Sequence, residues 1–171
     1  MIINFHIGEK VVYPNYGVGT IENIRTRAFG AQFEPFYLLR LAYRSMTVMV
    51  PFSHVGDLGL RRVTKSAEVN RVLNFLAEVK CKTCPDWKNR FRENSERMRV
   101  GTLTEVAEVF KTLLILNKEK PLSFREKKML DRARQLLISE VAIARSLAEP
   151  DAVDLLTRTV AKSALKFPEP M

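Results

Sequence analysis

The run Val11-Val12-Tyr13-Pro14-Asn15-Tyr16-Gly17-Val18-Gly19 decides how the N-terminal part of this chain folds. Its first three residues are β-branched or aromatic, which favours a strand. Pro14 fixes its own φ, and Asn15 and Gly17 tolerate positive φ, so a tight turn should follow that strand. A second strand is expected from Val18 to Arg27, and the glycines around its start would let it bend sharply.

The same alternation of strand and turn signals continues to about residue 62. Further strands are predicted at Phe36–Leu41, Met46–Pro51 and, as a short one, Leu58–Leu60. Loops around Gly30–Pro35 and Tyr43–Ser45 separate them. About five short strands with tight turns predict a small curled sheet or β-barrel, which we assign to residues 1–65.

From residue 66 onward the pattern is helical. Thr102-Leu103-Thr104-Glu105 and Ser123-Phe124-Arg125-Glu126 are both capping-box sequences, and apolar residues follow each at helical spacing. The second predicts a long helix from about 123 to 148. We therefore expect a two-part α+β protein, with an all-α bundle of about four or five helices over residues 66–171. The last residues, Phe167–Met171, hold two prolines and are expected to fray.

The charge balance restricts the partners. The chain has 28 Lys and Arg against 19 Asp and Glu, a net charge of +9, and proteins this basic tend to bind polyanions. No apolar run approaches the roughly 20 residues of a membrane span, and the N-terminus lacks the apolar core of a signal peptide. Two cysteines are too few for a disulfide scaffold and fit a reducing compartment. These features predict a cytoplasmic protein without a membrane partner.

Catalytic motifs are absent from the sequence. The two histidines, His6 and His54, lie in no metal-binding or hydrolase pattern. Gly17-Val18-Gly19 is too short for a dinucleotide-binding fingerprint and suits a strand bend. We therefore expect no catalytic residue, no metal and no cofactor.

One motif leaves an enzymatic alternative open. Cys81-Lys82-Thr83-Cys84 could be a redox dithiol, because neighbouring lysines lower a thiol pKa. A structural zinc would need two further ligands, and the chain has no second CxxC and no HxxxH. The helical surroundings lack the βαβ context of thioredoxin-like motifs, so we favour two loop cysteines over an oxidoreductase.

Two basic clusters lie near predicted helix starts. Residues 80–99 hold seven cations against three acids, and a helix starting at Asp86 would carry Lys88, Arg90 and Arg92 in its first two turns. The second cluster is Arg125, Lys127 and Lys128, at the start of the long helix. Cations at helix N-termini oppose the helix dipole but suit anion binding. The two clusters therefore predict phosphate contacts, with solvated charged faces as the alternative.

Trp87 lies beside the first cluster and is the only tryptophan. A single tryptophan is usually buried in a core. A helix start between Asp86 and Lys88 is a poor place to bury one, and an exposed aromatic among cations suits stacking on bases or wedging between base steps. From the residues alone, both interpretations stay open.

Several blocks of sequence, in a specific order over nearly the whole chain, resemble the CarD family of bacterial transcription regulators. The blocks are Gly8–Pro14 with Gly17-Val18-Gly19, Met46–Pro51, Val55–Arg61, Asp86–Arg90 with Asn94, and Leu122–Leu130. The β-module also resembles the polymerase-interacting domain of the transcription-repair coupling factor. That domain lacks the helical part, so the full-length resemblance points to CarD itself.

The resemblance implies a division of labour. The N-terminal domain would be a Tudor-like or SH3-like β-barrel that binds the β subunit of RNA polymerase. The helical domain would meet promoter DNA at the upstream edge of the melted region, where a tryptophan wedges into the minor groove. Trp87 occupies the wedge position. Arg92 and Lys127 match positions that contact or face DNA, and Arg27 and Met49 match positions at the polymerase surface.

We therefore expect a non-enzymatic, monomeric transcription regulator that stabilises the open promoter complex and joins the nucleoid through RNA polymerase. DNA contacts would be to the minor groove and phosphates, without sequence-specific readout. The expected DNA-binding residues are Trp87, Lys88, Arg90, Arg92, Lys127 and Lys128. The expected polymerase-binding residues are Arg25, Arg27, Met49 and Pro51. The alternative is a basic RNA- or protein-binding adaptor without a promoter role.

Overall fold

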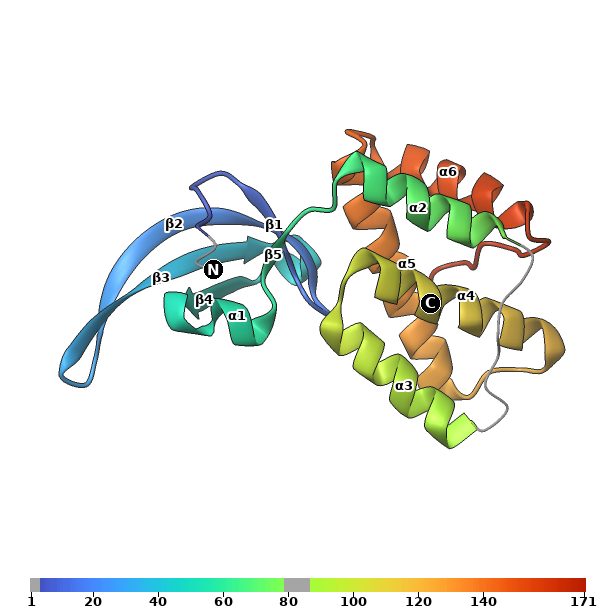
Figure 1. Ribbon diagram of the computed structural model, residues 1–171, viewed down its shortest axis with the longest axis horizontal. Helices are drawn as coiled ribbons and strands as arrows, with labels where there is room; N and C mark the ends of the chain where they lie inside the picture. Colours follow the sequence, from blue (N-terminus) through green and yellow to red (C-terminus); the bar gives the residue numbers. More distant parts are fainter. Residues whose placement is uncertain (1–3, 79–86) are drawn as a thin grey trace. The chain divides into compact units, whose positions relative to one another are not determined.

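The computed structural model describes residues 4–78 and 87–171. The chain divides into two compact units, Met1–Val63 and Thr64–Met171. The first is built on an antiparallel sheet and the second is helical (Figure 1). This agrees with the predicted two-part α+β fold class. Among the described residues, no helix combines the length and the apolar character needed to cross a membrane.

The first unit contains a five-stranded antiparallel sheet in the order β4-β3-β2-β1-β5. The strands are β1 (Lys10–Tyr13), β2 (Gly17–Phe29), β3 (Gln32–Leu41), β4 (Thr47–Pro51) and β5 (Arg61–Arg62). β2 and β3 form a long hairpin, drawn at one end of the unit in Figure 1. The hairpin is longer than predicted because β3 begins at Gln32 rather than at Phe36.

The predicted turn after β1 is present. Asn15 and Gly17 have φ values of 71° and 103°, as the turn requires. Gly19 has a different role: a Cβ at this position would lie 2.8 Å from Cδ1 of Leu39, so the absence of a side chain lets β2 approach β3 closely.

The last predicted strand was placed wrongly. Short 3₁₀ turns cover Tyr43–Ser45 (η1) and Phe52–His54 (η2), and Val55–Leu58 forms a helical turn, α1. Gly59, at a φ of 74°, ends that turn in the left-handed conformation. The chain joins the sheet only afterwards, as β5 beside β1.

One face of the sheet carries the core of the first unit. Tyr37, Leu39 and Val50 are at most 1% exposed, and the ring of Tyr37 stacks on Phe52 with centroids 4.3 Å apart. The hydroxyl of Tyr37 also accepts a hydrogen bond from the backbone N–H of Phe5 at 3.1 Å. Because side chains alternate along a strand, the neighbours of these residues point to the opposite face.

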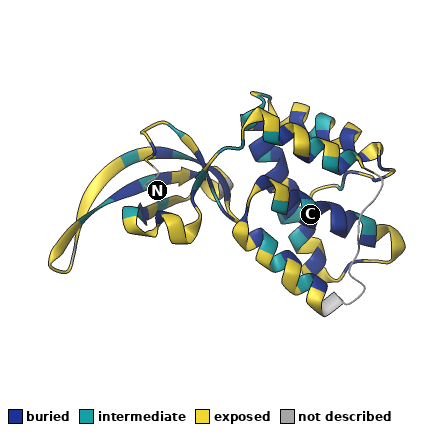
Figure 2. Cartoon of the chain, in the orientation of Figure 1, coloured by how far each residue is buried: buried dark blue, intermediate teal, exposed yellow. Residues whose placement is uncertain are grey.

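The second unit contains five helices in its described residues. They are α2 (Ser66–Ala77), α3 (Trp87–Val100), α4 (Leu103–Glu119), α5 (Phe124–Ala144) and α6 (Glu149–Ala161). Both predicted capping boxes begin helices: the Thr102 hydroxyl accepts from the amide of Glu105, and that of Ser123 from Glu126. Figure 2 shows the buried residues along α4 and α5, whose apolar faces form the core together with those of α2 and α6.

The expectation that Phe167–Met171 frays is wrong. Phe167 is 7% exposed and its ring lies 5.5 Å from that of Phe110 on α4. Arg134 on α5 donates to the carbonyl of Pro168 at 2.9 Å, and the amide of Met171 donates to Asp131 at 3.1 Å. The two prolines prevent a helix but not the docking of an extended tail.

Candidate functional sites

A buried ion pair joins the first turns of α3 and α5. Nη2 and Nε of Arg90 lie 3.0 and 3.2 Å from Oε2 of Glu126, and the two side chains are 5% and 6% exposed. The other oxygen, Oε1, accepts from the backbone N–H and the hydroxyl of Ser123 at 3.4 and 3.2 Å. Glu126 therefore completes the capping box of α5 and binds α3 at the same time.

This pairing corrects one predicted site residue. Arg90 was expected to contact DNA, but its residue is 4% exposed and its guanidinium is committed to Glu126. A phosphate could reach it only by displacing the carboxylate and opening the packing around it. Arg90 therefore belongs to the support of this region and not to its surface.

Other predicted cations are placed at the surface. Arg92, Lys127 and Lys128 are exposed, and within the described residues none of the three has a carboxylate within ion-pair distance. The Nζ atom of Lys128 lies 4.7 Å from the ring centroid of Phe124. These cations can therefore meet an external anion without first breaking an internal ion pair.

The rest of the first basic cluster is partly neutralised within the unit. Arg97 lies 3.6 Å from Glu105 and 3.2 Å from Glu108 on α4, and Arg99 pairs with Glu96. The hydrogen bond from Arg99 lowers the pKa of Glu96, which keeps that carboxylate charged. The arginines Arg97 and Arg99 in the C-terminal half of α3 are thus paired with carboxylates of this unit. The predicted cations left for an external anion lie near the starts of α3 and α5.

Trp87 is the first residue of α3, one helical turn before Arg90. Its side chain and that of Lys88 are outside the described part of the structure. Cys81 and Cys84 fall in residues 79–86, also outside the described residues, so the dithiol interpretation stays untested. The predicted start of this helix at Asp86 lies outside the described residues.

Phe124 is a surface feature that the sequence reasoning missed. It is the first residue of α5 and is 64% exposed, directly after the N-cap Ser123 and before Arg125. The signal was available, because an aromatic residue at a predicted helix start among cations is the pattern that singled out Trp87.

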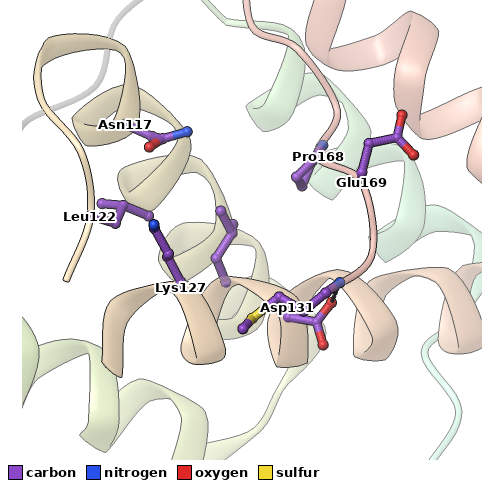
Figure 3. A pocket seen from close by; sticks show the side chains of 8 residues that line it. Asn117, Leu122, Lys127, Asp131, Pro168 and Glu169 are labelled. Atoms are coloured by element: carbon purple, nitrogen blue, oxygen red, sulfur yellow. Dashed lines mark hydrogen bonds between the residues drawn. The ribbon is translucent and has the colours of Figure 1, made fainter. Parts of the chain in front are cut away.

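A small cavity lies beside Lys127, between α5 and the C-terminal tail. Its volume is about 140 Å³, and Lys127 and Asp131 line it together with Pro168 and Glu169 of the tail. Figure 3 shows the Lys127 side chain extending toward Leu122, away from the carboxylate of Asp131. Two acids around one lysine make this cavity a poor anion site. No group of three or more His, Cys, Asp or Glu side chains suited to a metal occurs among the described residues.

The four predicted residues of the first unit share one face of the sheet. Strand register aligns Arg25 on β2 with Phe36 on β3, and Phe36 with Pro51 on β4. Arg27 is two residues after Arg25 on β2, and Met49 is two residues before Pro51 on β4. Directly opposed residues and those two apart point to the same side. This face is opposite to the core. Arg25, Arg27 and Met49 are exposed and Pro51 is half-buried.

Two of these residues are in contact. Nη1 of Arg27 lies 3.7 Å from Sδ of Met49, across β3. β4 is also one of the two edge strands of the described sheet. A cation, an exposed thioether and a sheet edge therefore occur together, which is a surface suited to a protein partner.

The chain joins a β-sheet unit that exposes arginines on one face to a helical unit that exposes cations near its helix starts. Its matches to known proteins are those of a two-domain transcription regulator. Residues 5–64 match the CarD-like/TRCF RID domain, and residues 71–157 match the CarD C-terminal domain. The chain belongs to the CarD family. It is 34% identical over 145 residues, 85% of this chain and 95% of the relative, to a protein of Bacillus subtilis (strain 168) named "Putative transcription factor YdeB". The family resemblance drawn from the sequence is confirmed.

Proposed function

We propose that this protein binds the β subunit of RNA polymerase through its N-terminal unit and stabilises the open promoter complex through its helical unit. Trp87 would wedge into the minor groove at the upstream edge of the melted region. The observation that carries the proposal is the joining of two helix starts by the Arg90–Glu126 pair, one beginning at Trp87 and the other carrying Lys127 and Lys128.

The polymerase contact is supported by the exposed face of the first unit. Arg27 and Met49 touch each other there, and Arg25 and Pro51 lie on the same side of the sheet. The family that matches residues 5–64 also includes a domain of the transcription-repair coupling factor. An interface with an arginine and a methionine near a sheet edge fits the residue types that are enriched at protein–protein contacts.

The DNA contact is supported by the electrostatics of the helix starts. Exposed backbone N–H groups and cations near an N-terminus attract phosphate without reading sequence. Of the predicted DNA-binding cations, Arg92, Lys127 and Lys128 are exposed, and the side chain of Lys88 lies outside the described part of the structure. Trp87 would supply the apolar contact between bases, where unstacking a step costs a few kcal/mol.

The wedge would act by differential affinity. A bubble edge is already partly unstacked, so an aromatic wedge binds the open state better than the closed duplex. Only such a difference can shift the equilibrium, and a preference of about 1.4 kcal/mol shifts it about tenfold. The mechanism uses no cofactor, and we propose that the protein acts as a monomer in the cytoplasm, held at promoters by polymerase.

The decisive experiment measures open-complex lifetime on one promoter with polymerase and either the wild-type protein or Trp87→Ala. We expect Trp87→Ala to keep its affinity for the β subunit and to shorten the lifetime. Trp87→Phe, which retains an aromatic ring, is the matched control and should restore part of the lifetime. An unchanged lifetime with Trp87→Ala would remove the wedge from the mechanism. Failure of the wild-type protein to retain purified β subunit would overturn the proposal and leave an adaptor of another kind.

A further inference from the structure

Of the apolar side chains Phe91 and Met98 of α3, the one nearer Trp87 is less buried than the one near the far end of the helix. Phe91, in the second turn, is half-buried, whereas Met98, near the other end of the helix, is buried. That other end is also tied to α4 by Arg97, which reaches Glu105 and Glu108. The contacts described between the first turns of α3 and the first turn of α5 are mainly polar.

The contact that suits this task is the pair described above. Arg90 is one turn after Trp87, and two of its nitrogens converge on one oxygen of Glu126. The guanidinium of Arg125 adds a second link from α5, 4.4 Å from the ring centroid of Phe91. Both links run from the first turns of α3 to the first turn of α5.

We propose that Arg90 and Glu126 are positioning residues, which hold Trp87 and the cations Lys127 and Lys128 as one rigid DNA-contacting surface. The inference rests on the proposed function and extends it to residues that do not touch DNA. Without the pair, the helix start that presents Trp87 could pivot relative to α5 while both helices stay folded.

The energetics of a buried ion pair favour a positioning role over a stabilising one. Removing two charges from water costs about as much as their attraction returns, so such a pair contributes little net stability compared with apolar residues of similar size. The geometry of the pair, however, is restricted, because the planar guanidinium can donate to the carboxylate in only a few orientations. Glu126 is itself held by Ser123 through the capping box. The ion pair therefore fixes the orientation of α3 relative to the start of α5.

Arg90→Met tests the inference because methionine keeps an unbranched side chain but removes the charge. Arg92→Met is the matched control, two residues away on the same helix and exposed. Trp87 is the single tryptophan of the chain, so its fluorescence anisotropy reports the local order of this helix start in the free protein. We expect Arg90→Met to lower that anisotropy and to shorten open-complex lifetime by the same factor as Trp87→Ala, with unchanged affinity for the β subunit. Arg92→Met should leave the anisotropy unchanged.

A double variant separates positioning from general damage. If Arg90 acts through Trp87, adding Arg90→Met to Trp87→Ala should shorten the lifetime no further. Full additivity of the two effects, or wild-type anisotropy and lifetime in Arg90→Met, would overturn the inference. Should circular dichroism show that Arg90→Met unfolds, Arg90→Lys serves instead. Lysine keeps the charge but cannot reproduce the two convergent N–H groups, so we expect an intermediate anisotropy, and a wild-type value would count against the inference.

The anisotropy also keeps this test independent of the proposed function. If Trp87→Ala leaves open-complex lifetime unchanged, the proposed function fails. The anisotropy of Arg90→Met still shows whether the ion pair positions this helix start.

Discussion

The buried ammonium of Lys111 on α4 donates a hydrogen bond of 2.7 Å to the carbonyl oxygen of Glu78, at the end of α2. It donates a second, of 2.5 Å, to the carbonyl of Phe75, whose ring centroid lies 4.6 Å from the same nitrogen. The last carbonyls of a helix have no partner within it. A lysine that is 0% exposed thus satisfies the C-terminus of a neighbouring helix.

Lys111→Met is expected to destabilise the helical unit, because it leaves the part-buried carbonyl of Glu78 at the end of α2 without its ammonium donor. The cost of such an unsatisfied group is about 1–3 kcal/mol. Urea denaturation followed by circular dichroism measures it. Lys120→Met, at an exposed position, is the control and should change the unfolding free energy by less than about 0.5 kcal/mol. Equal midpoints for the two variants would contradict the assigned role of Lys111.

Truncating the contact between Arg27 and Met49 should weaken polymerase binding. We expect Arg27→Ala or Met49→Ala to cost more than about 1 kcal/mol, which is roughly fivefold or more in affinity for the β subunit. Because both side chains are exposed, thermal stability should stay near that of the wild type. Arg71→Ala, an exposed arginine of α2, is the control and should bind normally. Normal binding by both truncated variants would remove this face of the sheet from the interface.

Lys127→Ala should reduce the salt dependence of DNA binding. Each phosphate that a cation neutralises contributes about 0.9 to the slope of log K against log salt on duplex DNA. The magnitude of the slope should therefore fall by about 0.9 in the variant, and its DNA affinity at low salt should be lower. Lys162→Ala, exposed at the end of α6, should leave the slope unchanged. An identical slope for Lys127→Ala and the wild type would favour a solvated face over a phosphate contact.

The acid stability of the first unit should depend on Glu34. The hydroxyl and the backbone N–H of Ser53 donate to its carboxylate and lower the pKa of Glu34 below its ordinary value. A depressed pKa in the folded state stabilises that state above the unfolded pKa, and this contribution is lost as the pH falls through the folded pKa. Glu34→Gln should therefore lose less stability on acidification than the wild type, as measured by urea midpoints at successive pH values.

Ser53→Ala tests the interaction between Ser53 and Glu34 from the donor side. It removes the hydroxyl donor and keeps the backbone N–H, so the pKa of Glu34 should move part of the way back toward its ordinary value. An NMR titration of Glu34 measures this directly. No movement of that pKa would show that the hydroxyl of Ser53 does not contribute.

Local chemistry allowed much of the fold to be predicted. The turn after β1 follows from Pro14, Asn15 and Gly17, and the helix starts at Thr102 and Ser123 follow from capping boxes of four residues. In each case the deciding interactions join residues at most three positions apart, so the sequence contains both partners of the interaction side by side. The predicted long helix also exists, although it ends at Ala144 rather than near 148.

The candidate sites could be predicted only in part. Trp87 and the cations Arg92, Lys127 and Lys128 were selected from residue type and position, and the three cations are exposed. Arg90 was selected on the same grounds, yet it is buried. A charge pattern identifies where cations gather in the chain. It does not distinguish a surface cation from one whose partner comes from another helix.

The sequence by itself therefore determined the two-part architecture, the turns and the helix caps, because these depend on neighbours along the chain. Tertiary structure alone decided the pairing of Arg90 with Glu126, 36 residues away, and the docking of Phe167 on Phe110. It also decided the common face of Arg27 and Met49, which depends on the register of three strands. Such contacts depend on how folded elements pack and align, and that geometry exists only once the elements have assembled.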